Sequence, residues 1–269
     1  MINKSFLKWA GGKSKLLDKI LPEIGEVTGR YIEPFLGSGV VAFNVEAKKY
    51  LLSDINPDLI SVYKYLCEWG ESFIDLCKYQ FDFYGLSVDQ FYEARARFNS
   101  TKDPLEKAAL FIFLNRHAFN GLCRYNSKGG FNVPCAKYKQ VSFPEEAMLS
   151  FIKRCDKYAF TCIGFSDVFS LLRKDDVVYC DPPYVPLSIT ASFTQYAVKD
   201  FDLQLHTTLA ELASASMCKV IISNHDTEFT RELYKNSDKQ YSFDVSRHVG
   251  GLSTSRRKAG ELLVVYNAK

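Results

Sequence analysis

Short apolar runs separated by polar or glycine-rich turns predict a sheet of buried strands. The runs lie at residues 30–35, 50–54, 159–163, 177–180 and 219–223. Each has the length and the apolar content of a buried strand. The first run leads through two glycines at 36–39 into an apolar stretch at 40–43, for which we expect a helix. This alternation of strands and helices predicts an α/β fold.

The last two apolar stretches differ in their connection. We expect strands at residues 242–249 and 262–266, and the Gly/Ser/Arg-rich loop between them is too short for a crossover helix. Parallel strands need such a crossover, whereas antiparallel strands do not. The sequence therefore predicts an antiparallel hairpin at one edge of the sheet.

A block of helical periodicity interrupts the strand pattern between residues 56 and 144. Segments 61–69, 88–98 and 104–116 carry apolar residues at helical spacing, and Asp103-Pro104 is typical of a helix start. A glycine- and asparagine-rich stretch follows at 120–139. We interpret residues 56–144 as a domain inserted into a second domain, which residues 1–55 and 145–269 form.

The composition is that of a globular protein, with 47% hydrophobic and 24% charged residues. No apolar run is long enough to cross a bilayer, and the N-terminus shows no signal peptide. The eight cysteines lack the spacing of zinc knuckles and redox motifs. We therefore expect a cytoplasmic protein with free thiols, no metal and no membrane association.

The formal charge of +3 conceals an uneven distribution. Residues 107–144 contain no Asp or Glu but six Lys or Arg residues, interleaved with aromatic residues. Residues 245–260 also lack acids and contain Arg247, Arg256, Arg257 and Lys258. Two solvated basic loops would explain the charge alone, but aromatic side chains among the cations favour contact with nucleic acid.

The strongest candidate for a catalytic motif is Asp181-Pro182-Pro183-Tyr184, directly after the expected strand 177–180. Ligands of open α/β sheets bind beyond the carboxyl ends of the strands, where this tetrapeptide falls. The prolines stiffen the turn, so that the Asp181 carboxylate and the Pro182 carbonyl form a fixed pair of acceptors. Two acceptors suit an exocyclic amino group with two hydrogens, and Tyr184 offers a ring that can stack on a planar base. A merely rigid loop is the alternative interpretation.

Residues 33–39, Glu-Pro-Phe-Leu-Gly-Ser-Gly, form a second candidate site together with Asp54. The glycines permit close approach of a ligand, and an acid at the end of the next strand commonly accepts hydrogen bonds from ribose hydroxyls. The longer G-x-G-x-x-G pattern of dinucleotide sites is absent, which favours a nucleoside cofactor. Residues 11–14, Gly-Gly-Lys-Ser, do not complete a phosphate-binding loop, because Leu7 stands where that loop requires glycine.

Six motifs, in their order along nearly the whole chain, resemble those of the DNA adenine methylase (Dam) family. They lie at residues 6–13, 33–39, 120–126, 131–134, 181–184 and 223–226. The resemblance implies transfer of a methyl group from S-adenosylmethionine to N6 of adenine in double-stranded DNA, typically in GATC, by base flipping and direct transfer. It also implies a Rossmann-like methyltransferase sheet with an antiparallel edge hairpin, and an inserted, mainly helical DNA-recognition domain with a β-hairpin. No obligate protein partner is implied.

The resemblance assigns roles residue by residue. The catalytic residues would be Asp181, Pro182 and Tyr184. The cofactor site would be lined by Trp9, Lys13, Glu33, Phe35, Gly37, Gly39, Asp54 and Asp181. DNA bases would be contacted by Lys8, Phe119, Asn120, Leu122, Arg124, Pro134 and Tyr138, and phosphates by Arg95, Arg116, Asn126, Asn132, Lys137 and Lys139. Arg124 would recognise a guanine, because a guanidinium matches the O6 and N7 acceptors.

The sequence departs from the family pattern at two of these positions. Phe119 stands where close relatives often have Tyr, so any hydroxyl contact is lost although the ring can still stack. Lys137 stands where Arg is frequent, which replaces a forked cation with a point charge.

Other functions remain open at this stage. An RNA base methyltransferase could share residues 181–184, but the resemblance at 120–126 would then be a coincidence. An amino-cytosine methyltransferase usually carries Ser in place of Asp181, and a catalytically silent DNA-binding module would not need the cofactor motifs. Cytosine-ring methylation uses a Pro-Cys nucleophile, but Pro134-Cys135 lies in the basic insertion. We expect His117 and His225 to be packed side chains and not proton shuttles.

Overall fold

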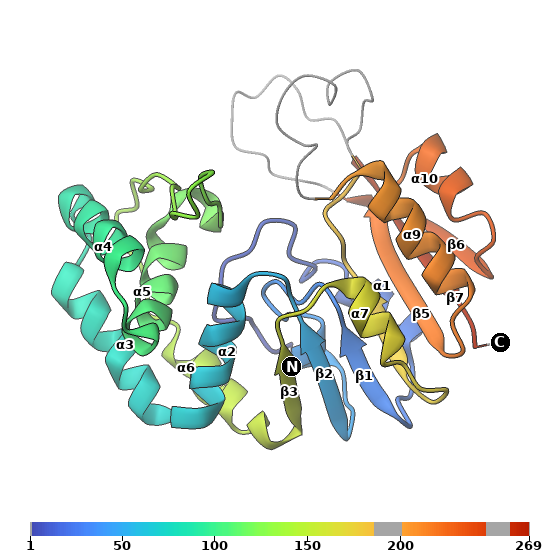
Figure 1. Cartoon of the computed structure of the whole chain (residues 1–269), viewed down its shortest axis with the longest axis horizontal. Helices are drawn as coiled ribbons and strands as arrows, with labels where there is room; N and C mark the ends of the chain where they lie inside the picture. Colours follow the sequence, from blue (N-terminus) through green and yellow to red (C-terminus); the bar gives the residue numbers. More distant parts are fainter. Residues whose placement is uncertain (1, 186–200, 246–258, 269) are drawn as a thin grey trace. The chain divides into compact units, whose positions relative to one another are not determined.

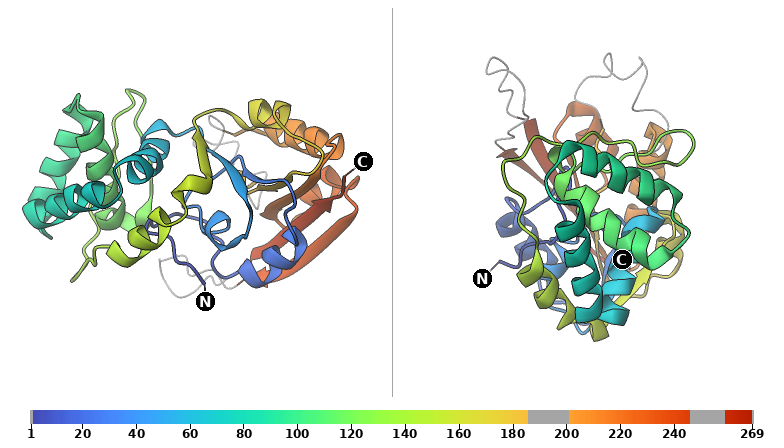
Figure 2. Two further views of the ribbon diagram at one scale, coloured as in Figure 1. Left: turned by 90° about the horizontal axis from the view of Figure 1, so that it is seen from below. Right: turned by 90° about the vertical axis from the view of Figure 1, so that its left-hand side faces the viewer.

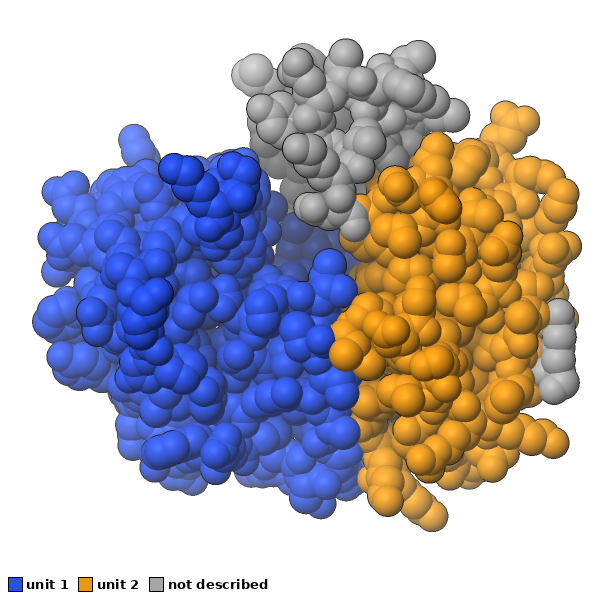
Figure 3. Space-filling view, viewed as in Figure 1, with its two compact units in different colours: residues 1–18, 36–46, 54–162 blue, residues 19–35, 47–53, 163–269 orange. Residues whose placement is uncertain are grey.

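The computed structural model describes residues 2–185, 201–245 and 259–268 (Figure 1). The chain forms two compact units, distinguished by colour in Figure 3. Unit 1 comprises residues 1–18, 36–46 and 54–162, and unit 2 comprises residues 19–35, 47–53 and 163–269. Each unit is therefore assembled from three segments of the chain.

Unit 2 is built on a mixed sheet. Its strands are β1 (Arg30–Glu33), β2 (Lys49–Ser53), β4 (Val177–Cys180), β5 (Lys219–His225), β6 (Lys239–Val245) and β7 (Ala259–Tyr266). They follow the order β2-β1-β4-β5-β7-β6, with the first four parallel and the last two antiparallel to their neighbours. The predicted strands in this unit and the antiparallel hairpin are confirmed. The end of the expected strand 242–249, from residue 246 on, lies outside the described residues.

Two helices, α7 (Phe165–Ser170) and α9 (Leu203–Ser214), cover one face of this sheet (Figure 2). Val178 and Cys180 on β4 pack with Val220 and Ile222 on β5 and with Leu209 on α9 in one buried cluster. Successive side chains of a strand point to opposite faces, so residues two apart share the helix-covered face. This packing anchors the strands and thereby places the residues that follow their carboxyl ends. The chain enters β1 after α1 (Leu17–Ile24), and α10 (Glu228–Leu233) lies between β5 and β6 in the sequence.

Unit 1 is mainly helical, with α2 (Pro57–Trp69), α3 (Glu71–Tyr84), α4 (Val88–Ser100), α5 (Pro104–His117) and α6 (Glu145–Ile152). Helix α5 is central: it contacts α2, α3 and α4, and its residues 108–115 are all buried. The predicted helix start is confirmed, because the Asp103 carboxylate accepts a hydrogen bond from the Leu105 amide (2.9 Å). None of the helices in the described part of the chain combines the length and the apolar character that crossing a bilayer requires.

Helix α3 was not predicted. Its buried residues Phe73, Ile74 and Cys77 recur at helical spacing, and Gly70 and Gly85 bound it at its two ends. Both signals are present in the sequence, so this helix could have been predicted.

Several short elements complete unit 1: η1 (Ala42–Asn44), η2 (Phe119–Gly121), η3 (Cys155–Lys157) and β3 (Tyr158–Thr161). The strand expected at 159–163 is thus confirmed. The helix expected at 40–43 is wrong, because this stretch forms only the single turn η1. The Asn44 side-chain amide donates to the Val40 carbonyl (2.7 Å), and Val45 is already extended. An asparagine that bonds the preceding turn in this way favours a helix end over its continuation.

The expectation that all thiols are free is wrong for one pair. Cys67 on α2 and Cys155 on η3 form a disulfide, with Cα atoms 5.2 Å apart. The two residues are 88 positions apart in the sequence, so only the packing of unit 1 brings them together. The other six cysteines are free, and Cys77, Cys180 and Cys218 are buried.

Candidate functional site

Polar residues gather at the carboxyl ends of three adjacent strands of unit 2. Glu33 is the last residue of β1, Asp181 directly follows β4, and Asn224 and His225 end β5. Strand β4 pairs in parallel with both β1 and β5, so the three ends lie at the same edge of the sheet. Open α/β sheets bind their ligands at this edge. Residues 181–184 thus occupy the position at a strand end that the sequence predicted.

The ring of Tyr184 is held from two sides. Its hydroxyl donates a hydrogen bond to Oε1 of Glu261, a buried residue of β7. The imidazole of His225 meets the ring edge to face, with ring centroids 4.8 Å apart. Burial raises the pKa of the Tyr184 phenol, and the carboxylates of Asp181 and Glu261 raise it further. The hydroxyl therefore stays protonated at neutral pH and remains a donor.

Sequence reasoning missed Glu261. One signal in the sequence could have identified it. Glu261 is an acid directly before the apolar run 262–266 of an expected strand, so it lies next to the buried part of the sheet. A charged residue in such a place is rarely buried unless a partner compensates it.

The backbone just beyond the tetrapeptide is anchored to β5. Asn224 is buried, and its Oδ1 accepts a hydrogen bond from the Val185 amide (3.2 Å) while its Nδ2 donates to the Tyr234 hydroxyl (3.1 Å). Nδ1 of His225 lies 2.6 Å from the Val185 carbonyl oxygen and donates to it. His225 is therefore a packed side chain, as expected, and it supports both Tyr184 and Val185.

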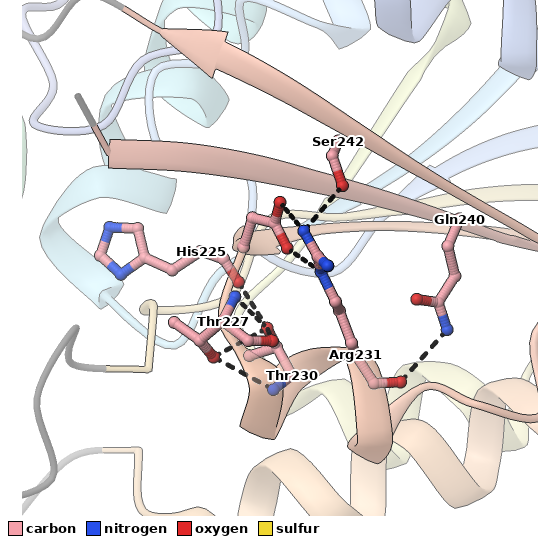
Figure 4. Close-up of polar contacts among 7 residues, drawn as sticks. His225, Thr227, Thr230, Arg231, Gln240 and Ser242 are labelled. Atoms are coloured by element: carbon pink, nitrogen blue, oxygen red, sulfur yellow. Dashed lines mark hydrogen bonds and ion pairs between the residues drawn. The ribbon is translucent and has the colours of Figure 1, made fainter.

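The turn after His225 is held by α10 (Figure 4). The Thr230 hydroxyl donates to the His225 carbonyl (2.6 Å) and accepts from the Thr227 amide (3.0 Å), which closes a capping box. Asp226 forms an ion pair with Arg231 through both carboxylate oxygens, at 2.6 and 2.7 Å. This arrangement gives Asp226 a structural role in the motif at 223–226.

Two predicted cofactor residues of unit 2 precede the glycine turn. Glu33 is buried, and its Oε2 accepts a hydrogen bond from the Tyr31 hydroxyl (3.2 Å). Burial raises the pKa of Tyr31, and the charge of Glu33 raises it further, so the phenol remains the donor. Phe35 stacks on Phe165 of α7, with ring centroids 5.5 Å apart. Glu33 is thus a hydrogen-bonded carboxyl group at a strand end.

In unit 1, Asp54 and the turn at Gly37 form one hydrogen-bonded assembly. The Gly37 amide donates to Oδ2 of Asp54 and the Asn56 amide donates to Oδ1, each at 3.0 Å. The Tyr63 hydroxyl donates to the Gly37 carbonyl (2.9 Å). Burial raises the pKa of Asp54, and the backbone N–H groups that bond to it oppose this shift. Each carboxylate oxygen has two lone pairs, so Asp54 retains capacity for hydrogen bonds from hydroxyl groups of a ligand.

The same turn brings an aromatic ring close to glycine backbone. Gly37 has a φ of +48°, and a Cβ there would lie 2.7 Å from Nε1 of Trp9. Gly39 has a φ of +67°, and a Cβ there would lie 2.4 Å from the Phe43 ring. An indole, a glycine backbone and the Asp54 carboxylate together suit a nucleoside, whose base stacks and whose ribose donates hydrogen bonds.

Lys13, another predicted cofactor residue, also belongs to unit 1. Its side chain is buried, and Nζ donates to the Gly11 carbonyl (2.6 Å). The lysine side chain thus bonds the backbone of its own Gly-Gly-Lys segment.

Three predicted DNA-contacting side chains lie together in unit 1. Nζ of Lys8 donates to the Arg116 carbonyl (2.8 Å) and lies 4.1 Å from the centre of the Tyr138 ring. The Arg116 guanidinium donates to the Ser142 carbonyl (3.1 Å). Burial lowers the pKa of Lys8, and the charge of Arg116 lowers it further. Two neighbouring cations repel each other, so a bound polyanion would stabilise this cluster.

The predicted β-hairpin lacks regular strands and is a hairpin-like loop with two isolated antiparallel bridges, Ala118–Cys135 and Tyr125–Phe131. Arg124 donates from Nε to Oδ1 of Asn132 (2.8 Å) and from Nη2 to the Asn132 carbonyl (3.3 Å). The exposed guanidinium is therefore held in one orientation before any ligand binds. Asn126, by contrast, uses its Oδ1 within the turn, where it accepts from the Gly130 amide (2.9 Å).

The other predicted DNA-contacting residues line the same region. Arg95 donates to the Val133 carbonyl (3.2 Å), and Phe119 is 48% exposed. Asn120 has a φ of +53°, a conformation that asparagine tolerates better than most residues. The remaining exposed or half-exposed members are Leu122, Pro134, Lys137 and Lys139. The second basic window, with Arg247, Arg256, Arg257 and Lys258, lies outside the described residues.

His117 and Cys135 are held by contacts within unit 1. His117 is buried and stacks on Phe113, with ring centroids 4.0 Å apart. Burial lowers the pKa of His117 to about 4, so the imidazole is neutral. The Cys135 thiol donates to the Ala136 carbonyl (3.3 Å), and burial raises its pKa. A raised thiol pKa disfavours the thiolate that nucleophilic attack needs.

Comparison with known proteins gives a consistent result. Residues 9–249 match the family described as D12 class N6 adenine-specific DNA methyltransferase. The chain is 40% identical to the DNA adenine methylase of Haemophilus influenzae, over 99% of this chain and 95% of that protein. It is 42% identical to the DNA adenine methylase of Escherichia coli K12, over 98% and 95% of the two chains. For the DNA adenine methylase of Vibrio cholerae the identity is 39%, over 98% and 96%.

Proposed function

Since the chain belongs to the D12 class of N6 adenine-specific DNA methyltransferases, we propose that it methylates N6 of adenine in double-stranded DNA at GATC sites, with S-adenosylmethionine as methyl donor. One observation above all supports this proposal. Residues 181–184 follow β4 at the ligand-binding edge of the sheet, and Glu261 and His225 hold the Tyr184 ring. The resemblance at residues 120–126 supports GATC as the target.

In the proposed reaction, Asp181 and Pro182 act on the amino group of adenine. The Asp181 carboxylate and the Pro182 carbonyl accept hydrogen bonds from its two N–H groups, which draws the nitrogen towards tetrahedral geometry and makes its lone pair nucleophilic. The Tyr184 ring stacks on the base and sets the direction of the lone pair. Bound S-adenosylmethionine would supply an electrophilic methyl group on its sulfonium.

The cofactor would be held by a carboxylate, aromatic rings and a glycine turn. Asp54 would accept hydrogen bonds from the ribose hydroxyls, Trp9 and Phe35 would offer aromatic surface, and Gly37 and Gly39 would allow close approach. Glu33, Lys13 and Asp181 complete the proposed set.

Recognition would rest on residues 56–144, which we propose as the target-recognition region between catalytic segments 1–55 and 145–269. The target adenine cannot be reached inside a duplex, so it must be flipped out at a cost of a few kcal/mol. Insertion of the Phe119 ring and the Leu122 side chain offsets that cost. Lys137, Lys139 and the other cations bind phosphates and set the register.

The proposed function is tested by methylation of random-sequence duplex DNA, followed by mapping of the modified adenines. Methylation centred on GATC is the expected result. A preference for RNA in a competition assay, or methylated cytosine in the product, would favour one of the two rival methyltransferases. Absence of S-adenosylmethionine binding in a calorimeter would favour a silent DNA-binding module. Cell fractionation would test the proposed cytoplasmic location.

Arg124→Ala is expected to relax the requirement for guanine at one position of the site by ~1–3 kcal/mol. The guanidinium is already oriented by Asn132, so the loss removes a preorganised donor pair. The measurement is kcat/KM on GATC duplexes and on duplexes with that guanine replaced. Lys128→Ala is the matched control, because Lys128 is an exposed cation of the same loop. An equal loss of kcat/KM in both variants, on both kinds of duplex, would indicate that Arg124 contacts a phosphate and not a base.

Tyr184→Phe is expected to lower kcat by roughly 3- to 10-fold, because the hydrogen bond that orients the ring is lost. KM for DNA should change little, since the ring acts on the base only after flipping. Fluorescence of 2-aminopurine at the target position reports the stacking step directly. Glu261→Gln keeps an acceptor for the hydroxyl and should retain most of the activity. A Tyr184→Phe variant with wild-type kcat would contradict the role of this bond.

A further inference from the structure

Asn115, near the end of α5, bonds both backbone groups of Lys8. The Lys8 amide donates to Oδ1 of Asn115 (2.8 Å), and Nδ2 of Asn115 donates to the Lys8 carbonyl (2.7 Å). Asn115 is only 1% exposed, so water does not compete for these bonds. A side-chain amide that bonds both the N–H and the C=O of one residue supplies the same donor and acceptor as a neighbouring strand would. It therefore fixes where that residue lies.

Further contacts from the same part of unit 1 restrict Lys8. A Cβ at Gly121 would lie 2.3 Å from Cβ of Lys8, so the two residues touch closely. The Lys8 ammonium is placed by the Arg116 carbonyl and the Tyr138 ring, as described above. Lys8 is 107 positions from Asn115 in the sequence, yet every one of these contacts comes from residues 115–138. The N-terminal segment is thus attached to the surface that carries the predicted DNA-contacting residues.

We propose that Asn115 is a positioning residue for base recognition, which holds Lys8 on the recognition surface so that Lys8 can discriminate one base of the target. This inference rests on the proposed function. Asn115 itself is buried and does not reach the DNA, so it acts through Lys8. An apolar side chain of similar size would leave the Lys8 amide and carbonyl without these two bonds, so it is the amide of Asn115 that fixes the backbone of Lys8.

Asn99 provides a matched control. It pairs in the same way with Phe131 of the hairpin, since the Phe131 amide donates to its Oδ1 (2.8 Å) and its Nδ2 donates to the Phe131 carbonyl (3.1 Å). Loss of this second pair disturbs the hairpin but leaves Lys8 in place. Comparison of variants at Asn115 and Asn99 therefore separates a local effect on Lys8 from a general disturbance of unit 1.

The test measures kcat/KM on the GATC duplex and on duplexes in which each base pair is replaced in turn. Lys8→Ala first identifies the position that Lys8 discriminates. Asn115→Ala is expected to reduce discrimination at that same position by roughly tenfold. The double variant should lose no more than Lys8→Ala alone, and Asn99→Ala should leave this position unchanged. Asn115→Leu, which preserves volume and removes both bonds to the Lys8 backbone, gives the same answer if Asn115→Ala does not fold.

A second measurement needs no substrate. Hydrogen exchange at the Lys8 amide should accelerate in the Asn115 variants and not in Asn99→Ala. Unchanged exchange in a folded Asn115 variant would overturn the proposal, and so would an equal loss of rate at all base positions. If the wild-type protein methylates no duplex, the proposed function is wrong, and the exchange experiment still decides whether Asn115 holds Lys8.

Discussion

Asp181→Ala is expected to reduce the rate of methyl transfer by about 10²- to 10³-fold or more, with little change in affinity for duplex DNA. The Asp181 carboxylate is one of only two acceptors proposed for the adenine amino group, and it follows β4 at a fixed place in the sheet. Its removal leaves the amino nitrogen planar and weakly nucleophilic. The residues proposed to contact DNA lie elsewhere in the chain, so binding should persist.

Single-turnover kinetics with labelled methyl donor, together with a DNA-binding titration, separate the two effects. Asp175→Ala is the control, because Asp175 is an exposed acid just before the opposite end of the same strand. Its loss should change neither rate nor affinity. Wild-type turnover by Asp181→Ala would remove the basis of the proposed mechanism.

Asp54→Ala is expected to weaken binding of S-adenosylmethionine by about 10- to 100-fold, the loss of charge-assisted hydrogen bonds to the ribose. The Gly37 amide also loses its acceptor, which loosens the turn beside the Trp9 ring. Calorimetry without DNA measures this affinity directly. Asp58→Ala is the control, because its carboxylate is engaged by Lys107 (2.9 Å) and the Tyr125 hydroxyl (2.8 Å). Unchanged affinity in Asp54→Ala would place the ribose elsewhere.

The raised pKa of Asp54 also predicts a dependence on pH. Burial raises the pKa, so Asp54 becomes protonated at a higher pH than an exposed aspartate. The ionised form is the better acceptor, so cofactor affinity should be full above this pKa and should decline as the pH falls through it. Asp54→Asn cannot titrate, and its affinity should therefore lack this decline.

Local patterns allowed much of the fold to be predicted. The strand at 177–180 was predicted with its correct ends, because four apolar residues between polar neighbours leave no other place for it. Asp103-Pro104 identified the start of α5, because capping depends only on adjacent residues. The error at 40–43 has a local cause as well, since Asn44 ends the turn from its side chain.

The site was predicted less completely, because some of its contacts join distant residues. Glu261 bonds Tyr184 across 77 positions, and Asn115 bonds Lys8 across 107. The disulfide between Cys67 and Cys155 has the same character. No periodicity or motif in one sequence specifies which of many distant polar side chains will meet.

By itself, therefore, the sequence determined the strands of the sheet and its antiparallel hairpin, the place of Asp181-Pro182-Pro183-Tyr184 at a strand end, and the family to which these motifs belong. Only the tertiary structure decided how the functional side chains are held: Tyr184 by Glu261 and His225, Arg124 by Asn132, and Lys8 by Asn115. The physical reason is that backbone conformation follows from neighbouring residues, whereas the orientation of a side chain depends on whatever the fold packs against it.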